Sequence, residues 1–434
     1  MNIEDVIDNI NAGKNIFDVG NIVNISDFVV EVCGLDKAFY YEKINLANKA
    51  IGYVTEISPS TCMVAIIKKQ EELVIGDKAI RTNEIYEGFF SSQALGRMIN
   101  ILGEDPLLGK TYEKLVKVPI EDDNISIMDR GTVNEQLHTG ITGIDLMYPI
   151  GLGQRQLIIG DKKTGKTQIA LDTIVNQKGK KIICIYCPIG KTMKEVKKIY
   201  YDLLNKEAMR YTIIVPAFND YPAPSLVLTP YYAMSIARLY MQAGINCLVV
   251  LDDLKRHADA YREVSLMSGK APGRDAYPAD IFYLHSRLLE KGCKYKNGAS
   301  ITVLPIVETK GEDITDYIST NIISITDGQL VLSSKNFQKG IKPAINYGLS
   351  VSRLGGAVQN KEMKACGTLL RRRLLSYLEM ASIYELSNQD ELSDGIKNIM
   401  AEGKRILANL TQERYSPKSE EEMLADYHFL SELK

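Results

Sequence analysis

The chain has 434 residues, of which 45% are hydrophobic and 24% charged, and its formal net charge is −2. This profile is typical of a soluble globular protein, and the length predicts about two to four domains. The balanced charge and the short basic runs, such as Lys194–Lys198, argue against a nucleic-acid-binding chain. No window reaches the ~18 apolar residues of a membrane span, and the start lacks a secretory signal, so we expect a cytoplasmic protein without direct membrane insertion.

The N-terminal part has the spacing of a small all-β module. Short apolar stretches such as FVVEVCG, AIGYVTEI and CMVAIIKK are separated by Gly, Asn, Asp and Ser turns. Strands that recur at intervals of roughly ten residues are typical of small barrels and sandwiches. We predict an N-terminal β-barrel domain over residues 1–92.

From residue 93 the pattern changes to apolar strand, glycine turn and amphipathic helix. We expect strands at QLIIG, KIICIYCPIG, TIIVPA, NCLVVLDD, SITVLPIVET and NIISITDG. Such alternation indicates a parallel sheet covered by helices on both faces. We predict that this α/β domain spans residues 93–358.

A phosphate-binding loop is predicted within this domain. The segment GDKKTGKT, Gly160 to Thr167, follows QLIIG and precedes a helix-forming run. Glycines at its ends allow a tight turn that points backbone N–H groups at a phosphate, and Lys166 can reach the outer phosphates. An ordinary glycine turn is the alternative. The predicted nucleotide contacts in this loop are Lys162, Lys163, Thr164, Gly165, Lys166, Thr167 and Gln168.

The chain also offers an acid for a metal ion. NCLVVLDD is an apolar strand that ends in Asp252, and an acid in this place commonly holds Mg²⁺ in phosphate-loop proteins. The hydroxyl of Thr167 is the second expected metal ligand. The sequence therefore predicts ATP or ADP together with Mg²⁺, bound through Thr167 and Asp252.

Two cysteines in the same domain invite a different interpretation. Cys184 and Cys187 form a lone CxxC within the run KIICIYC, and the chain has an odd total of seven cysteines. A metal or redox site would normally need further ligands nearby. We expect two buried, reduced strand thiols instead.

The last part of the chain is predicted to be helical. After Arg353 no strand-like run appears, and the segments MKACGTLLRRRLLSYLEMASIYEL and DGIKNIMAEGKRILANL have helical spacing. We predict an all-α domain over residues 359–434.

These motifs together resemble one family. The stretch TVNEQLHTGITGIDLMYPIGLGQRQLIIGDKKTGKTQIALDTIVNQK is similar, nearly residue for residue, to alpha subunits of F-type ATP synthases. LVVLDDLKRHADAYREVSL, APGRDAYPADIFYLHSRLLE and KGIKPAINYGLSVSRLGG follow in the family's order. The resemblance implies an α/β P-loop (RecA-like) core between an N-terminal β-barrel and a C-terminal helical domain.

The resemblance also implies a role without catalysis. In this family, alpha-type and beta-type subunits alternate in a ring of six around a central shaft, and the beta type carries the catalytic sites. A beta subunit has a glutamate directly after the second strand's glycine, where it orients the attacking water. This chain has Lys191 there, and an ammonium has no lone pair to accept a proton. We expect the isolated chain to be inactive, although Lys191 could also be a solvated lysine.

Arg353, in SVSRLGG, matches the family's arginine finger. Such a finger leaves its own subunit and contacts the γ-phosphate in the neighbouring beta-type site. A guanidinium suits this because its charge is permanent and its donors form a planar fork. The alternative is an ordinary surface arginine in a salt bridge.

The resemblance carries over only in part at the adenine end. Phe337, Pro343 and Gln412 match residues near the base. The chain departs from the family at Lys342, where an arginine is common, and at Arg414, which replaces a second glutamine. We expect all five residues to contribute to the nucleotide site.

The segment PGRDAYPAD resembles the loop that forms a sleeve around the shaft. The resemblance implies a central-stalk partner contacted by residues 271–280. A plain surface loop is the alternative.

Both ends of the chain are shorter than the family pattern, which leaves open whether the partner is a peripheral stalk or another machine. The abundance of Lys, Asn, Ile and Tyr, without Trp, resembles proteins of AT-rich genomes such as mycoplasmas. This favours a divergent F-type-like ATPase, with the chain peripheral on the inner face of the membrane when assembled. The main rival is a self-sufficient hexameric NTPase motor of the secretion or helicase type, which should carry glutamate at position 191. A structural protein that has lost its nucleotide is a second rival.

Overall fold

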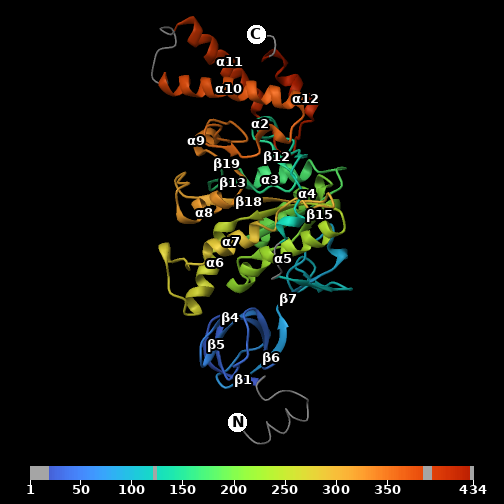
Figure 1. Ribbon diagram of the computed structural model, residues 1–434, viewed down its shortest axis with the longest axis vertical. Coiled ribbons are helices and arrows are strands. Elements are labelled where there is room, and N and C mark those ends of the chain that lie inside the picture. Colours follow the sequence, from blue (N-terminus) through green and yellow to red (C-terminus); the bar gives the residue numbers. More distant parts are fainter. Residues whose placement is uncertain (1–18, 121–124, 385–392, 431–434) are drawn as a thin grey trace, which may run out of the picture.

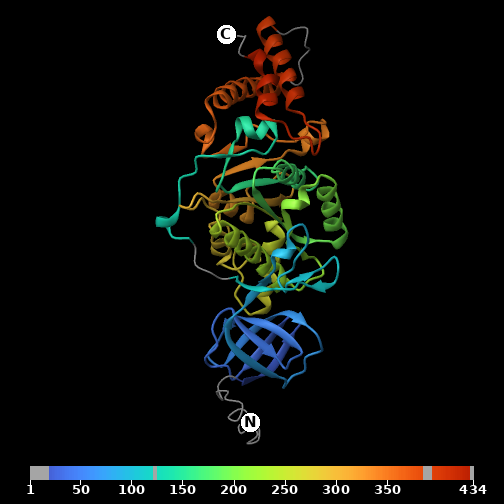
Figure 2. The same ribbon diagram turned by 90° about the vertical axis from the view of Figure 1, so that its right-hand side faces the viewer.

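A computed structural model describes residues 19–120, 125–384 and 393–430 of the chain. Figures 1 and 2 show three parts stacked along the longest axis: a β-barrel at one end, an α/β body in the middle and a pair of long helices at the other end. The part of the predicted barrel domain at residues 1–18 lies outside the described residues.

The N-terminal part is a closed barrel of six strands in the order β1-β2-β5-β4-β3-β6. Buried and partly buried side chains alternate along β3, so that Ile44 and Leu46 face the interior. The predicted barrel is thus confirmed. Its strands are β1 Val19–Ser26, β2 Val29–Cys33, β3 Glu42–Leu46, β4 Ala50–Ile57, β5 Thr61–Lys69 and β6 Lys78–Ile85.

A small connecting region joins the barrel to the body. Strand β7 (Glu87–Phe90) pairs antiparallel with β10 (Val116–Pro119). Gly88 lets this pair approach the helix behind it, because a Cβ atom here would lie 2.5 Å from the Tyr232 ring. The other short strands are β8 Glu104–Asp105, β9 Lys110–Thr111, β11 Gln136–Leu137 and β12 Ile150–Gly151.

The body is built on a largely parallel sheet in the order β15-β14-β17-β18-β13-β19-β20, with β16 beside β14. Only β20 runs antiparallel to its neighbour. Runs rich in Ile and Val fill the central strands because both of their faces are buried. The strands are β13 Gln156–Asp161, β14 Ile182–Lys191, β15 Thr212–Ile214, β16 Ala217–Phe218, β17 Asn246–Asp252, β18 Ile301–Thr309, β19 Gly328–Val331 and β20 Val351–Ser352.

Helices cover both faces of this sheet, so the predicted α/β architecture is confirmed. One face packs against α5, α6, α7 and α8, and the other against α2, α3 and α4 (Figure 1). The helices are α2 Thr142–Met147, α3 Lys166–Val175, α4 Met193–Asn205, α5 Ala223–Gln242, α6 Leu254–Met267, α7 Ile281–Leu289, α8 Tyr317–Ile325 and α9 Ser334–Gln338. Short 3-10 turns span Ser92–Ala94, Ile127–Asp129, Ala208–Tyr211, Arg274–Ala276, Gly355–Ala357 and His428–Leu430.

One predicted strand was wrong. Most of NIISITDG belongs to helix α8, and the strand begins only at Gly328. The carboxylate of Asp316 caps this helix by accepting hydrogen bonds from the backbone N–H groups of Ile318 and Ser319. A short apolar run is compatible with a buried helix as well as with a strand. In this chain the N-cap at Asp316 favours the helix.

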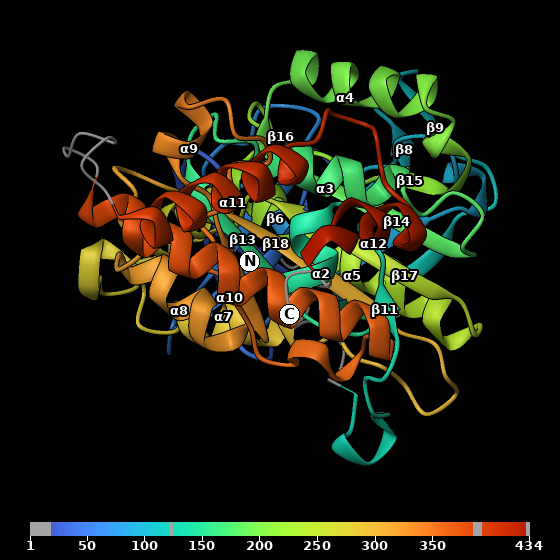
Figure 3. The ribbon, with the colours of Figure 1, turned by 90° about the horizontal axis from the view of Figure 1, so that it is seen from above.

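The C-terminal helices lie across the top of the body, as Figure 3 shows. Helix α10 (Lys361–Ile383) packs against α2, and a Cβ atom at Gly367 would lie 2.0 Å from the Leu146 carbonyl oxygen. Helix α11 (Asp394–Leu410) packs along α10, and α12 (Glu420–Asp426) follows. Within the described ranges, none of the helices combines the length and the apolar character needed to cross a membrane.

Candidate functional site

The predicted phosphate loop joins β13 to α3. Gly165 has φ 101° and ψ 13° and stands at the N-cap of the helix. A side chain would be strained in this left-handed conformation, although no atom lies within 4 Å of where its Cβ would stand. Gly165 thus begins α3 at the end of the phosphate loop, and the first backbone N–H groups of a helix form a site that can bind an anion.

Lys166 lies over this loop. Its Nζ donates a hydrogen bond to the carbonyl oxygen of Asp161 at 2.6 Å, and its side chain is largely buried. Burial lowers the pKa of Lys166. The hydroxyl of Thr164 donates to the same carbonyl at 2.8 Å, whereas Lys162 and Lys163 are exposed at the turn. The loop thus holds one buried ammonium, with two more cations at its rim.

Asp161 also anchors the loop through its side chain. Its Oδ1 atom accepts hydrogen bonds from the Thr309 hydroxyl at 2.6 Å and from the Glu312 backbone N–H at 2.8 Å. Both donors lie at or just after the end of β18, the strand beside β13. The phosphate loop is therefore attached to the segment that leads to α8.

The Asp252 carboxylate is the centre of the polar cluster beside the loop. Its Oδ2 atom accepts hydrogen bonds from the Thr167 hydroxyl at 2.7 Å and the Tyr186 hydroxyl at 2.9 Å, and its Oδ1 atom lies 3.1 Å from Nζ of Lys191. Strand pairing brings these groups together, because Pro188 on β14 stands opposite Asp252 on β17. The two predicted metal ligands, Thr167 and Asp252, thus lie in direct contact.

This donor set fits Mg²⁺, which prefers hydroxyl, carboxylate and water oxygens. A bound Mg²⁺ would have to share the Asp252 carboxylate with Lys191, which already neutralises it. The site therefore offers the expected oxygens in an environment that is less negative than the motif alone predicts.

Lys191 is not a freely solvated lysine. Its side chain is only 23% exposed and is paired with Asp252, which is 2% exposed. Burial by itself lowers the pKa of Lys191, but the ion pair with Asp252 outweighs it and the pKa is raised. The residue is therefore a fixed ammonium, and it has no lone pair to orient water by accepting a proton.

Asp253 is the next residue along the chain. It is buried at the start of α6, where its Oδ1 atom accepts a hydrogen bond from the Arg256 backbone N–H at 2.8 Å. Burial, together with the negative charge of Asp252, raises the pKa of Asp253 to about 6. This carboxyl group takes up a proton in mildly acid solution.

Three of the residues predicted at the adenine end are brought together. Nζ of Lys342 lies 5.2 Å from the centre of the Phe337 ring. The backbone N–H of Gln412 donates to the Lys342 carbonyl oxygen at 2.7 Å. The Gln412 side chain is used within the protein, because its Oε1 accepts from the Thr142 backbone N–H and its Nε2 donates to the Gly140 carbonyl. Pro343 follows directly after Lys342.

Gln168 and Arg414 are arranged around Asp172 on helix α3. Gln168 Nε2 and the backbone N–H of Tyr415 each donate to Asp172 Oδ1 at 2.8 Å. Burial raises the pKa of Asp172, and the charge of Arg414 opposes that shift. The segment that follows α11 therefore packs against α3, the helix that begins at the phosphate loop.

Arg353 lies apart from the phosphate loop. It follows β20, the strand at the edge of the sheet, and its side chain is exposed. Its backbone N–H donates to the Asp327 carbonyl at 3.0 Å, and its guanidinium to the Ile323 carbonyl at 3.5 Å. The backbone is held while the charged end faces outward.

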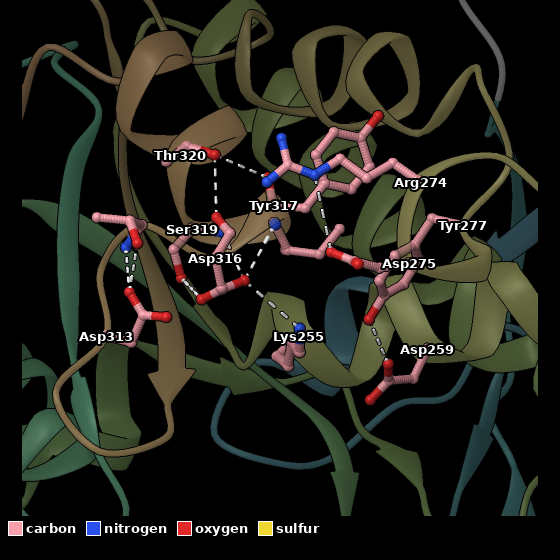
Figure 4. Close-up of polar contacts among 12 residues, drawn as sticks. Lys255, Asp259, Arg274, Asp275, Tyr277, Asp313, Asp316, Tyr317, Ser319 and Thr320 are labelled. Carbon is pink, nitrogen blue, oxygen red and sulfur yellow. Dashed lines mark hydrogen bonds and ion pairs between the residues drawn. The ribbon is translucent and has the colours of Figure 1, made fainter.

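The loop over residues 271–280 is anchored to the body through Tyr277 (Figure 4). The Tyr277 hydroxyl donates to Asp259 at 2.7 Å, and its ring lies 4.7 Å from the Arg262 guanidinium. Nζ of Lys255 lies 5.4 Å from that ring and 3.6 Å from Asp316. Residues 271–276 are exposed, although the Arg274 guanidinium lies 5.3 Å from the centre of the Tyr317 ring.

Sequence reasoning missed Tyr186 and the contacts that Asp161 makes with Thr309 and Glu312. Tyr186 lies inside an apolar strand, and only the register of β14 against β17 brings its hydroxyl to Asp252.

Cys184 and Cys187, by contrast, are buried free thiols as expected. Within the described residues, no cluster of three or more His, Cys, Asp or Glu side chains could hold a metal ion.

Comparison with known proteins gives a consistent result. Residues 140–352 match the model of the ATP synthase alpha/beta family, nucleotide-binding domain. The chain is 41% identical to an ATP synthase subunit alpha of Macrococcus caseolyticus, over 95% of this chain and 82% of that protein. It is 39% identical to the ATP synthase subunit alpha of Ehrlichia ruminantium, over 98% of this chain and 85% of that protein. For that of Mycoplasma pneumoniae the identity is 39%, over 94% and 79% respectively.

Proposed function

The chain belongs to the ATP synthase alpha subunit family, and from this premise we propose that it is a nucleotide-binding, non-catalytic subunit of a hexameric rotary ATPase. In the proposed complex it alternates with a catalytic beta-type subunit. The observation that carries the non-catalytic part is the ion pair between Lys191 and Asp252, because a fixed ammonium stands where a catalytic subunit needs a group that accepts a proton.

The proposed ligand is ATP or ADP with Mg²⁺. The open helix N-terminus at Gly165 and the buried ammonium of Lys166 would hold the phosphates. Thr167 and Asp252 would hold Mg²⁺, which in such sites neutralises the charge of the outer phosphates. Phe337 would lie against the adenine ring.

Further residues would form the base end of this pocket. In addition to Phe337, the residues proposed at this end are Gln168, Lys342, Pro343, Gln412 and Arg414. Two contacts support this grouping. The Tyr415 backbone N–H donates to Asp172 on α3, and the Gln412 backbone N–H donates to the Lys342 carbonyl oxygen.

Two exposed features suggest how the subunit would act on its neighbours. The outward-facing guanidinium of Arg353 would enter the beta-type site and stabilise the charge on the transferred phosphoryl group. The loop over residues 271–280, which is exposed at residues 271–276, would contact the central shaft. The complex would then lie peripherally on the inner face of the membrane, attached to a peripheral stalk or to another machine.

Purification of the full chain from its own cells tests this function. Mass spectrometry should find a beta-type partner in equal amount, together with a shaft subunit, and the purified chain alone should show no steady-state ATP hydrolysis. Hydrolysis by the lone chain that Lys166→Ala abolishes would instead identify a self-sufficient motor. A chain without any beta-type partner would also refute the proposal.

A further inference from the structure

Both oxygens of the Asp252 carboxylate contact groups of this chain. Thr167 and Tyr186 donate to one oxygen, and the Lys191 ammonium lies 3.1 Å from the other. A magnesium site of this type normally leaves the acid free to accept hydrogen bonds from metal-bound water. Here a side-chain cation already takes one of these acceptor positions.

The position of Lys191 gives this cation an effect on phosphate as well as on Asp252. Thr167 belongs to the phosphate loop and contacts the same carboxylate as Lys191. Because this ammonium offsets the negative charge of Asp252 beside the loop, the positive charge of Lys166 is less opposed. Because Asp252 and Tyr186 are almost completely buried, the charge acts through a medium that screens it weakly.

Resting on the proposed function, we propose that Lys191 is a built-in counter-cation for the nucleotide's phosphates, so that this chain binds ATP with little dependence on a divalent metal. By offsetting the Asp252 carboxylate, the ammonium supplies part of the positive charge that Mg²⁺ supplies in related sites. It also repels a dication from the Asp252 carboxylate, which weakens the competing metal. Groups of the protein then hold the nucleotide whether or not Mg²⁺ is bound.

A purely structural role for the ion pair makes a different prediction. If Lys191 only linked β14 to β17, its removal would lower the stability of the fold without changing how metal affects ATP binding. The dependence of ATP affinity on Mg²⁺ therefore separates the two roles, and it requires no turnover.

The experiment is calorimetry of ATP binding to the isolated full-length chain, once with excess Mg²⁺ and once with EDTA. For the wild-type chain the dissociation constants in Mg²⁺ and in EDTA should agree within about threefold. A difference of this size is smaller than the contribution of one charge-assisted hydrogen bond. Lys191→Gln should bind about tenfold more weakly in EDTA while changing much less in Mg²⁺. Lys191→Arg, which keeps the charge, should retain binding in EDTA.

Lys194→Gln is the matched control, since Lys194 is an exposed lysine three residues further along the chain. It should behave like the wild-type chain in both buffers, and retained binding in Mg²⁺ shows that the Lys191 variants are folded. Wild-type binding that requires Mg²⁺ overturns the inference and leaves the proposed function standing, whether or not the variants fold. Equal affinities of Lys191→Gln and wild type in EDTA also overturn it. If the wild-type chain binds no ATP in either buffer, the proposed function fails as well.

Discussion

The phosphate end of the pocket and the edge of the sheet at β20 use charged residues in opposite ways. At the phosphate end, Lys166 and Lys191 are mostly buried and are bonded to groups of their own chain. At the edge, the backbone of Arg353 is held while its guanidinium is exposed. Charges that are satisfied internally suit a site that retains a ligand, whereas an exposed guanidinium on a held backbone suits contact with another chain.

The two regions are linked by the sheet that carries them. The phosphate loop follows β13, and Arg353 follows β20, with only β19 between these strands. A change at one region can therefore be made without touching the side chains of the other. This separation allows binding by this chain and catalysis in a neighbour to be tested independently.

The largest effect is expected at the edge. Arg353→Ala in the assembled complex should lower ATP turnover by about 1,000-fold or more, because the charge on the transferred group loses its guanidinium partner. Steady-state hydrolysis measures turnover, and calorimetry on the isolated variant should show unchanged ATP binding. Arg372→Ala, at an exposed arginine on α10, is the control. Near-normal turnover of the Arg353 variant would show that the exposed guanidinium does not act in a neighbouring catalytic site.

A smaller effect is expected at the phosphate end. Lys166→Ala should weaken ATP binding by the isolated chain roughly 10- to 100-fold, because an ammonium hydrogen bond to phosphate is lost. In the complex, its turnover should fall less than that of Arg353→Ala, since the pocket proposed here is not catalytic. Lys194→Ala serves as the control for lysine loss. Unchanged ATP affinity would mean that this loop does not hold the phosphates.

The smallest effect concerns pH and should appear only at the phosphate end. The folded chain keeps the Asp253 proton up to a pKa of about 6, whereas the ordinary value is 3.8. Between these values the folded state holds a proton that the unfolded chain has released, so this group's contribution to stability falls as pH rises from about 4 to 6. Asp253→Asn keeps an N-cap acceptor and should be more stable than wild type by about 1–2 kcal/mol at pH 7.5, with little gain at pH 4.

Thermal unfolding midpoints across this pH range measure the effect. Asp313→Asn is the control, because Asp313 is exposed and hydrogen bonds from Thr315 lower its pKa, so that no gain at neutral pH is expected. An equal gain for Asp253→Asn at pH 4 and pH 7.5 would contradict the assigned titration.

Local patterns allowed much of the architecture to be predicted. Alternation of apolar strand and amphipathic helix predicted the α/β body, and closely spaced β segments predicted the barrel. The glycines and Lys166 of the phosphate loop are recognisable because their order along the chain is the feature that binds phosphate. The strand order within the barrel, with β5 between β2 and β4, depends on pairings distant in sequence and could not be predicted in this way.

The same limit applies to the candidate site. That Lys191 would pair with Asp252, and that Tyr186 would join them, depends on the register of β14 against β17, which no local pattern encodes. The mistaken strand at NIISITDG has a different cause. The apolar residues of this stretch fit the period of a helix as well as that of a strand. The N-cap at Asp316 lies N-terminal to the stretch.

The closed barrel at the N-terminal end has a consequence for how copies of such chains could lie side by side. A closed barrel leaves no strand edge on which another chain could add a strand. Barrels that lay side by side would then have no barrel strand edge through which to pair. Contacts between them could therefore change by single substitutions without rebuilding any strand pairing.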